Sequence, residues 1–300
     1  MKNLLFVYNP HSGKGIVKEY LSDIFDFFVK NDYKISVYPT QERLDAREYI
    51  INNAYGSDMV VCSGGDGTLN EVISGMMELP ERPALGYIPA GSTNDFGQSI
   101  KIPKSILEAA DVAINGVPIM VDVGNFGKRN FVYVAAFGAF TDVSYMTPQE
   151  MKNLLGHSAY LIDAITKITS LRTYHMKVSC EDGNMVEDDF LYGMITNSIS
   201  VGGFKGITGK NIVLDDGYFE VMLIKKPKNA IDLNIILGAI LGMDFKTESI
   251  VSFKASEIVF ESNEKVPWVL DGEYGGSPQK IKIVNNKQAI KIMSGISKKN

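Results

Sequence analysis

The stretch Val60–Val72, VVCSGGDGTLNEV, joins an apolar, strand-like run to a helix-like run through three glycines and one aspartate. A chain uses glycine where the backbone must turn sharply or approach another group closely. A turn of this kind between a buried strand and a helix is typical of α/β proteins, in which parallel strands alternate with helices. The segment therefore predicts a layered α/β sheet around it.

Residues 1–120 repeat this alternation of strand, loop and helix. The expected strands are 4–8, 34–38, 59–62 and 85–88, and the expected helices are 16–29, 44–54 and 68–77. Loops rich in Gly, Ser, Thr and Asn follow the first, third and fourth strands. Because ligands bind beyond the carboxyl ends of the strands in open parallel sheets, these three loops are expected to converge on one site.

From about Val121 the pattern changes to β-branched and aromatic strands separated by turn signals such as Asp182-Gly183, which favours antiparallel pairing. The expected strands are 131–136, 174–180, 190–197, 219–224, 258–261, 268–271 and 281–284, and the expected helices are about 149–171 and 230–241. The sequence thus predicts an α/β domain, residues 1–120, and a β-rich domain, residues 121–300. Whether the last residues pack back on the first domain stays open.

Charge and composition argue against several classes of protein. The net charge is −5 and the basic residues are scattered, which disfavours a nucleic-acid partner bound by phosphate neutralisation. Cys62 and Cys180 lie in apolar runs and are expected to be reduced and structural. The apolar segment 230–243 is shorter than the roughly 20 residues of a spanning helix, and the first residues lack a signal-peptide pattern. We expect a cytoplasmic protein; peripheral attachment at the inner membrane face and a homodimer stay open.

The glycine turn is suited to binding phosphate. Three glycines within residues 64–67 leave bare backbone before a helix, whose free N–H groups and dipole favour an anion. Thr68 and Glu71 have the spacing of a capping box, which predicts that the helix starts at Thr68. Asp66 is explained if it holds Mg²⁺ or accepts a proton from an attacking hydroxyl. A tight turn with Asp66 facing water is the alternative.

Two further loops carry groups that a nucleotide needs. The first strand is followed by Asn9-Pro10-His11-Ser12-Gly13-Lys14-Gly15, in which Lys14 supplies a mobile cation. The upstream glycine of a Walker A loop is missing, and no G-x-G-x-x-G occurs. The fourth strand is followed by Gly91-Ser92-Thr93-Asn94-Asp95-Phe96, which offers hydroxyls, an amide and a carboxylate, although this composition also suits a helix start. Together the loops favour a nucleotide site.

Taken in order, NPHSGKG, GGDGTLNEV, PAGSTNDF and the late Asp271-Gly272-Glu273 resemble the diacylglycerol kinase catalytic domain family, especially its small bacterial lipid kinases. The resemblance spans nearly the whole chain, whereas GGDGT alone is shared with NAD kinases and phosphofructokinases. It implies an α/β nucleotide-binding domain, a β-rich lipid-substrate domain, and ATP with Mg²⁺ in the cleft between them. A lipid hydroxyl, with diacylglycerol as the first candidate, would receive the phosphate. Ser92 departs from the family, which usually has Thr there.

The resemblance also implies roles for numbered residues. Those implied to bind the nucleotide and its Mg²⁺ are Asn9, Ser12, Gly13, Lys14, Thr40, Gly64, Gly65, Asp66, Gly67, Thr68, Asn70, Gly91, Ser92, Thr93 and Asn94. Those implied in catalysis are Asp66, Asp95, Asp271 and Glu273, with Glu273 or Asp66 as the proton acceptor. A structural Mg²⁺ is implied at the Asp216 carboxylate and the carbonyls of Val213 and Tyr218, for which an Asp-Gly hairpin is the alternative. Asp122 is implied in a charge network, with Lys167 as a candidate partner.

Two other functions stay open. A soluble metabolite kinase of the NAD kinase type shares the GGDGT turn, but the GSTNDF and DGE elements favour a lipid acceptor. A non-catalytic nucleotide-binding module is disfavoured by the intact Lys14, Asp66 and Glu273. Apolar residues at 145–171 and 230–241 are candidates for a lipid entrance, and core packing explains them equally well.

Overall fold

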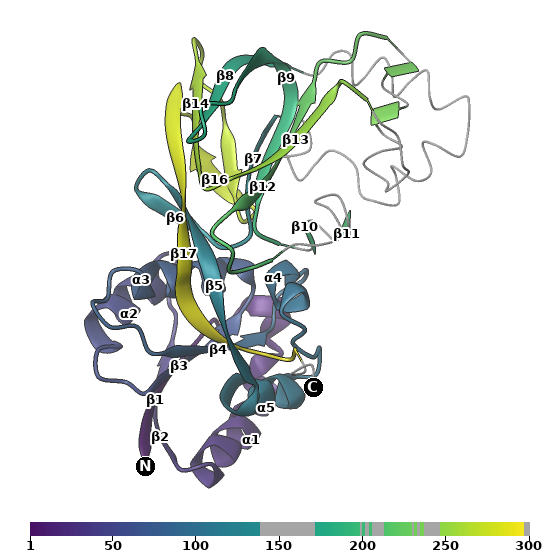
Figure 1. Cartoon of the computed structure of the whole chain (residues 1–300). Coiled ribbons are helices and arrows are strands. Elements are labelled where there is room, and N and C mark those ends of the chain that lie inside the picture. The colour runs from purple at the N-terminus through teal and green to yellow at the C-terminus, as the bar shows by residue number, and fades with distance from the viewer. Residues whose placement is uncertain are drawn as a thin grey trace.

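The structure, a computed structural model, consists of an α/β lobe and a β-rich lobe that share one large mixed sheet (Figure 1). It describes residues 1–138, 172–198, 200–201, 204–205, 213–229, 231–232, 235–236 and 247–296. The strands of the α/β lobe pair in parallel and those of the β-rich lobe pair antiparallel. The predicted fold class is therefore confirmed.

Four parallel strands form the sheet of the α/β lobe, in the order β2, β1, β3, β4. Their bounds are β1 Lys2–Tyr8, β2 Tyr33–Pro39, β3 Met59–Gly64 and β4 Ala84–Pro89. β3 is buried along its whole length. A strand covered on both faces has no reason to alternate polar and apolar residues, which is why β3 reads as a continuous apolar run.

Helices cover both faces of this sheet. They are η1 Ser12–Gly15 (a 3-10 turn), α1 Val17–Lys30, α2 Asp45–Asn53, α3 Asp66–Met76, α4 Asp95–Ser99 and α5 Ile106–Asn115. α1 packs beside α5 and α2 packs beside α3, on opposite faces (Figure 1). α1 buries Val17, Ile24 and Phe28 along one side, as an amphipathic helix does. No helix in the described ranges combines the length and hydropathy needed to cross a bilayer.

The β-rich lobe is an antiparallel sheet in the order β16, β15, β7, β9, β8, β14, with β12 and β13 branching from β9. Its strands are β6 Arg129–Phe131, β7 Val134–Gly138, β8 Tyr174–Cys180, β9 Met185–Thr196, β12 Phe219–Lys225, β13 Ile250–Ala255, β14 Glu257–Ser262, β15 Trp268–Leu270 and β16 Glu273–Gly276. A separate pair is formed by β10 Ser200–Val201 and β11 Phe204–Lys205. The Trp268 ring lies 4.8 Å from that of Phe137 and 5.1 Å from that of Phe260, in the core of this lobe.

Two long strands run through both lobes: β5 Val117–Phe126 and β17 Lys280–Ser294 (Figure 1). The first part of β17 pairs with β14, and the strand also pairs with β5 as far as Ser294. Near its end, Ile292 lies opposite Leu85 of β4 in parallel register. The predicted strand 281–284 is therefore only the beginning of a strand that connects the lobes.

The predicted strand 131–136 is not continuous: Phe131 ends β6, and residues 134–136 belong to β7. The backbone N–H groups of residues 132–134 donate to the carboxylate of Asp271, at the point where the chain passes from β6 to β7. Helix 149–171 lies outside the described residues, and of helix 230–241 only 231–232 and 235–236 are described. The predicted domain boundary falls inside β5 and stays a prediction.

Candidate active site

The three loops that follow β1, β3 and β4 meet, as predicted. The backbone N–H of Gly65 donates to the hydroxyl of Ser12 at 3.2 Å. Gly65 and Gly91 pack backbone against backbone, and a Cβ added to Gly91 would lie 2.6 Å from the Cα of Gly65. Because any side chain at position 91 would push the loops apart, glycine is required where they touch.

The loop after β1 is folded tightly against the end of β4. The side-chain oxygen of Asn9 accepts the backbone N–H of His11 at 2.9 Å, and its amide donates to the hydroxyl of Thr68 at 3.4 Å. Gly13 has a φ of 53°, in the left-handed region. A Cβ at Gly13 would lie 2.1 Å from the carbonyl oxygen of Ala90, so only glycine fits.

Helix α3 begins at Asp66, two residues earlier than the predicted start at Thr68. Its N-cap is Gly65, and no side chain caps the helix. The predicted capping box is therefore wrong: Glu71 instead accepts the backbone N–H of Leu44 at 2.9 Å, at the start of α2. The first N–H groups of α3 thus have no side-chain acceptor and can bind an anion.

A first cavity of about 400 Å³ lies over this helix start. The predicted site residues that line it are Asn9, Ser12, Thr40, Gly65, Gly67, Thr68 and Glu273. Glu273, at the start of β16, comes from the opposite lobe. Its Oε1 would lie 3.3 Å from a Cβ on Gly67, and its Oε2 lies 2.6 Å from Nη2 of Arg43. The first cavity therefore combines an anion-binding helix start with a carboxylate from the other lobe.

Asp66 directs its carboxylate toward α4. It accepts the backbone N–H of Asp95 at 3.3 Å and that of Phe96 at 3.4 Å, and the hydroxyl of Thr93 at 3.3 Å. Burial, and then the nearby charge of Asp95, raise the pKa of Asp66, while these hydrogen bonds lower it. Two acidic side chains thus lie together in a partly buried place, which favours a bound cation.

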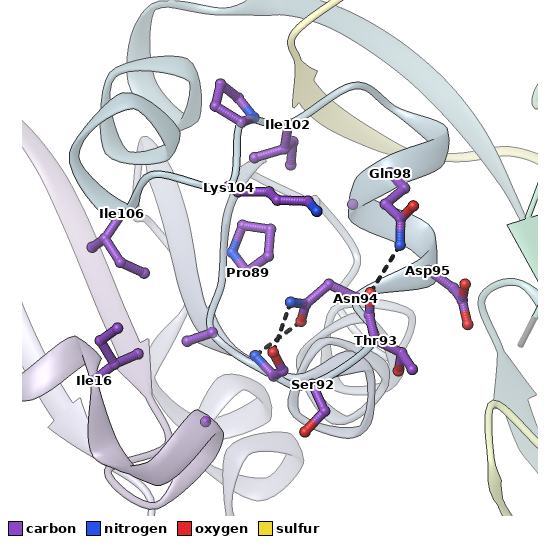
Figure 2. A pocket seen from close by; sticks show the side chains of 15 residues that line it. Ile16, Pro89, Ser92, Thr93, Asn94, Asp95, Gln98, Ile102, Lys104 and Ile106 are labelled. Carbon is purple, nitrogen blue, oxygen red and sulfur yellow. Dashed lines mark hydrogen bonds between the residues drawn. The ribbon is translucent and has the colours of Figure 1, made fainter. Parts of the chain in front are cut away.

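A second cavity of about 520 Å³ adjoins the same loops at Gly13 and Gly91 (Figure 2). The predicted site residues that line it are Gly13, Gly91, Ser92, Thr93, Asn94 and Asp95. Figure 2 shows the Asn94 side chain bonded to both the N–H and the carbonyl of Gly91, at 2.9 Å each. Ile102, Ile106 and Lys104 complete the wall. Most of the predicted site residues are therefore divided between two neighbouring cavities, but Asp66 lines neither of them.

Asp271 and Asn70 line neither cavity. Asp271 is 5% exposed, and its carboxylate accepts the backbone N–H groups of residues 132–134 at 2.7 to 3.0 Å and the Asn70 amide at 2.6 Å. Burial raises the pKa of Asp271 to about 6, although these hydrogen bonds lower it. The Asn70 amide also donates to the carbonyl of Asn130 at 3.1 Å. Their positions suit a structural role, in which the two side chains join α3 to the β-rich lobe. They suit the predicted roles, catalysis for Asp271 and nucleotide binding for Asn70, less well.

The predicted structural metal position is occupied by a lysine. Oδ2 of Asp216 lies 2.9 Å from Nζ of Lys254, and Oδ1 accepts the backbone N–H of Tyr218 at 2.9 Å. Lys254 also lies 3.0 Å from Oε1 of Glu220, and Val213 is exposed nearby along the chain. Within the part of the chain that the structure describes, no three Asp, Glu, His or Cys side chains gather as a metal site. One carboxylate with backbone carbonyls still suits a hard cation, and that carboxylate is here paired with the ammonium of Lys254.

Asp122 is buried and connects two segments of the β-rich lobe. Its carboxylate accepts the backbone N–H of Gly217 at 2.7 Å and that of Gln288 at 2.6 Å. Burial raises the pKa of Asp122. The carboxylate thereby holds the loop before β12 against an irregular part of β17. Lys167, its predicted partner, lies outside the described residues.

Known proteins resemble this chain over nearly its whole length. A family model described as "Diacylglycerol kinase catalytic domain" matches residues 3–126. The diacylglycerol kinase of Bacillus subtilis (strain 168) is 34% identical over 278 residues, which cover 92% of this chain and 91% of that protein. The diacylglycerol kinase of Staphylococcus carnosus (strain TM300) is 33% identical over 302 residues, which cover 100% of this chain and 97% of that protein.

The chain belongs to the diacylglycerol kinase family. A crystal structure of a diacylglycerol kinase from Bacillus anthracis str. Sterne shares the fold, with a TM-score of 0.74 and 22% identity over 98% of this chain and 97% of that one. A second structure from that organism has a TM-score of 0.81 and 26% identity over the same shares. Membership in this family makes the chain a kinase, that is, a phosphotransferase.

Sequence reasoning missed the cation of the first cavity. It predicted Lys14 as the cation beside the nucleotide, but Lys14 lines neither cavity. Gly64 also lines neither cavity, because it packs against Thr68. Arg43 supplies the positive charge instead. The family motifs do not contain Arg43. Its place three residues after Thr40, in the loop that follows β2, was the one signal that pointed to the site.

Proposed function

We propose that the chain transfers the terminal phosphoryl group of ATP to a lipid hydroxyl, first that of diacylglycerol, and releases phosphatidic acid and ADP. One observation supports this most: in the first cavity, Glu273 from the β-rich lobe stands over Gly67 at the uncapped start of α3. Phosphoryl transfer to an alcohol needs an anion site and a proton acceptor in one place. The relatives named diacylglycerol kinases support the lipid acceptor.

The phosphates of ATP are assigned to the first cavity. Bare N–H groups from Asp66 to Thr68 suit the phosphates, and Asn9, Ser12 and Thr40 surround them. A volume of about 400 Å³ is in the range of small-molecule sites. Thr40, which follows β2 and lines the same cavity, is assigned a contact with the nucleotide.

Asp66 and Asp95 are assigned to the Mg²⁺ that accompanies ATP. They are close enough for the charge of Asp95 to raise the pKa of Asp66, so a cation bound there would relieve their repulsion. Bound Mg²⁺ neutralises phosphate charge during transfer. A second, structural Mg²⁺ is assigned to Asp216 with the carbonyls of Val213 and Tyr218, where it would replace the ammonium of Lys254.

Glu273 is assigned as the proton acceptor in preference to Asp66. Its side chain is 42% exposed and lines the first cavity, whereas the Asp66 carboxylate is already engaged by three donors around α4. The lipid oxygen attacks the terminal phosphorus, the bond to the ADP oxygen breaks, and the hydroxyl proton passes to Glu273. Asp271, two residues before Glu273, positions it from a buried place.

Labelled ATP identifies the acceptor. The purified protein is incubated with labelled ATP and Mg²⁺ in three arms: diacylglycerol in mixed micelles, NAD, and a total lipid extract, with Glu273→Gln as the inactive control. We expect label in phosphatidic acid in the first and third arms and none in NADP. Label in NADP alone assigns the chain to the NAD kinase type. Label in a different lipid from the extract would identify that lipid, in place of diacylglycerol, as the acceptor. No transfer in any arm refutes the proposal.

Contact with a membrane follows from the acceptor, because diacylglycerol stays in a bilayer. We propose peripheral attachment at the inner face, by a cytoplasmic protein without a nucleic-acid partner. The segments 145–171 and 230–241, expected to line a lipid entrance, lie mostly outside the described residues. Flotation with anionic vesicles that contain diacylglycerol is expected to carry the protein upward. Protein left entirely at the bottom argues against attachment. A homodimer stays a prediction.

A further inference from the structure

Arg43 gives the first cavity a cation to which the family motifs assign no role. Among the described residues that line this cavity, Arg43 alone has a fixed positive charge, while Glu42, Glu71 and Glu273 are acidic. Its Nη2 lies 2.6 Å from Oε2 of Glu273. Of the ion pairs in the described ranges, this one alone connects the α/β lobe with the β-rich lobe.

This ion pair is exposed and exchanges easily. The side chain of Arg43 is 61% exposed and that of Glu273 is 42% exposed. An ion pair in this setting adds little stability, because water screens it and ordering two long side chains opposes it. The lobes are joined by β17 and by the buried Asn70–Asp271 contact. Arg43 is therefore free to change partners without loss of the fold.

The guanidinium lies beside the backbone proposed to bind phosphate. The Glu273 carboxylate lies between the start of α3 and Arg43, with one oxygen 3.3 Å from a Cβ built on Gly67 and the other 2.6 Å from the guanidinium. A phosphate carries more negative charge than a carboxylate and also accepts two parallel bonds from the planar guanidinium. A phosphate bound at the start of α3 therefore competes with Glu273 for Arg43.

We propose that Arg43 exchanges between Glu273 and the terminal phosphate of ATP. This rests on the proposed function. Without nucleotide, the guanidinium holds Glu273 over Gly67; with ATP, it binds the terminal phosphate and leaves the carboxylate free. The lipid oxygen then bonds to phosphorus, the bond to ADP breaks, and the proton goes to Glu273. Glu273 thus becomes available as a proton acceptor when ATP occupies the first cavity.

Nucleotide binding by Arg43→Gln tests this exchange. Calorimetry measures the Kd values of a non-hydrolysable ATP analogue and of ADP, both with Mg²⁺. Loss of a charge-assisted bond to the terminal phosphate is expected to raise the Kd of the ATP analogue about tenfold or more. The Kd of ADP, which lacks that phosphate, should rise less than about threefold. Arg43→Lys keeps the charge and is expected to recover part of the affinity. Arg47→Gln is the matched control: Arg47 pairs with Glu78 at 3.2 Å, does not line the first cavity, and should bind both nucleotides normally.

A Glu273→Gln background separates direct contact from an effect through Glu273. If Arg43 contacts the phosphate, Arg43→Gln weakens binding of the ATP analogue in this background by at least the same factor, because Glu273 no longer competes for the guanidinium. If Arg43 acts only by holding Glu273, the substitution has no further effect there, and the proposal is overturned. Equal losses for ADP and the analogue also overturn it, as does unchanged binding in a variant with a normal Tm. A wild-type protein that binds neither nucleotide refutes the proposed function itself.

Discussion

The carboxylate of Asp66 accepts the backbone N–H of Asp95 at 3.3 Å, so the first residue of α3 is bound to the first residue of α4. It also accepts the N–H of Phe96 at 3.4 Å. α4 in turn contacts the segment just after β9 through Ser99, whose hydroxyl lies 2.8 Å from that of Ser198. Asp66 therefore holds a short helix in place as well as lying where Mg²⁺ is proposed to bind.

Substitutions of Asp66 separate these two roles. Asp66→Ala removes the cap of α4, which costs about 1 kcal/mol, and also removes the charge. Asp66→Asn keeps an oxygen acceptor, so we expect a Tm near that of the wild type and a turnover at least about 10²-fold lower. Thermal unfolding and a coupled ATP assay measure the two effects. Near-normal turnover in a folded Asp66→Asn protein refutes the metal role.

Gly67→Ala tests the placement of the phosphates. Alanine suits the first turn of a helix better than glycine, by about 0.5–1 kcal/mol, so α3 should be at least as stable. The added methyl would lie 3.3 Å from Oε1 of Glu273, in the first cavity. We expect the KM for ATP to rise about tenfold or more because the methyl crowds the phosphates. A variant with normal Tm and unchanged KM shows that the phosphates bind elsewhere.

Asp271 connects stability with pH. Burial raises its pKa from 3.8 to about 6 in the folded protein. Between these two values the folded state binds more protons than the unfolded state. The stabilising contribution of this group is therefore complete below about pH 4 and is lost as the pH rises through 6. A difference of about two pKa units corresponds to about 3 kcal/mol.

Urea unfolding of the wild type and of Asp271→Asn, at pH 4 and pH 7, measures this contribution. The amide does not titrate and accepts fewer backbone N–H groups, so the variant is expected to be less stable at both pH values. Other titrating groups are common to both proteins and cancel. The loss of unfolding free energy should be greater at pH 4 than at pH 7 by about 2 kcal/mol. An equal loss at the two pH values would show that the pKa of Asp271 is not raised.

The proposed metal at Asp216 is tested without nucleotide. Millimolar Mg²⁺ is expected to raise the Tm of the wild type by a few degrees, because the ion binds only the folded protein. Lys254→Met removes the competing ammonium, 2.9 Å from the carboxylate, and should keep or increase this rise. Asp216→Asn should abolish it. If Asp216→Asn responds as strongly as the wild type, the metal is held somewhere else.

The loops at the strand ends could be predicted because their signals are local. Gly65 and Gly91 each follow a buried strand, and neighbouring parallel strands bring such loops to one edge. Glu273 was placed at the site through the family motif DGE. The same motif gave no sign that Asp271 binds backbone N–H groups 137 to 139 residues away in sequence. That partnership lies at the point where the predicted strand 131–136 is divided.

Tertiary contacts overrode local patterns elsewhere. Thr68 and Glu71 have capping-box spacing, but Glu71 accepts the backbone N–H of Leu44, and α3 starts at Asp66. Arg43 carries no motif and reaches Glu273 across 230 residues of sequence. Neither contact can be read from neighbouring residues, because the first depends on how α2 packs on α3 and the second on where β16 lies relative to the loop after β2.

A structure of the protein with Mg²⁺ and a non-hydrolysable ATP analogue tests the central claim most directly. The claim predicts phosphates along the N–H groups from Asp66 to Thr68, with the terminal group beside Arg43 and Glu273. Phosphates in the second cavity, between Gly13 and Lys104, with an empty start of α3, would contradict it.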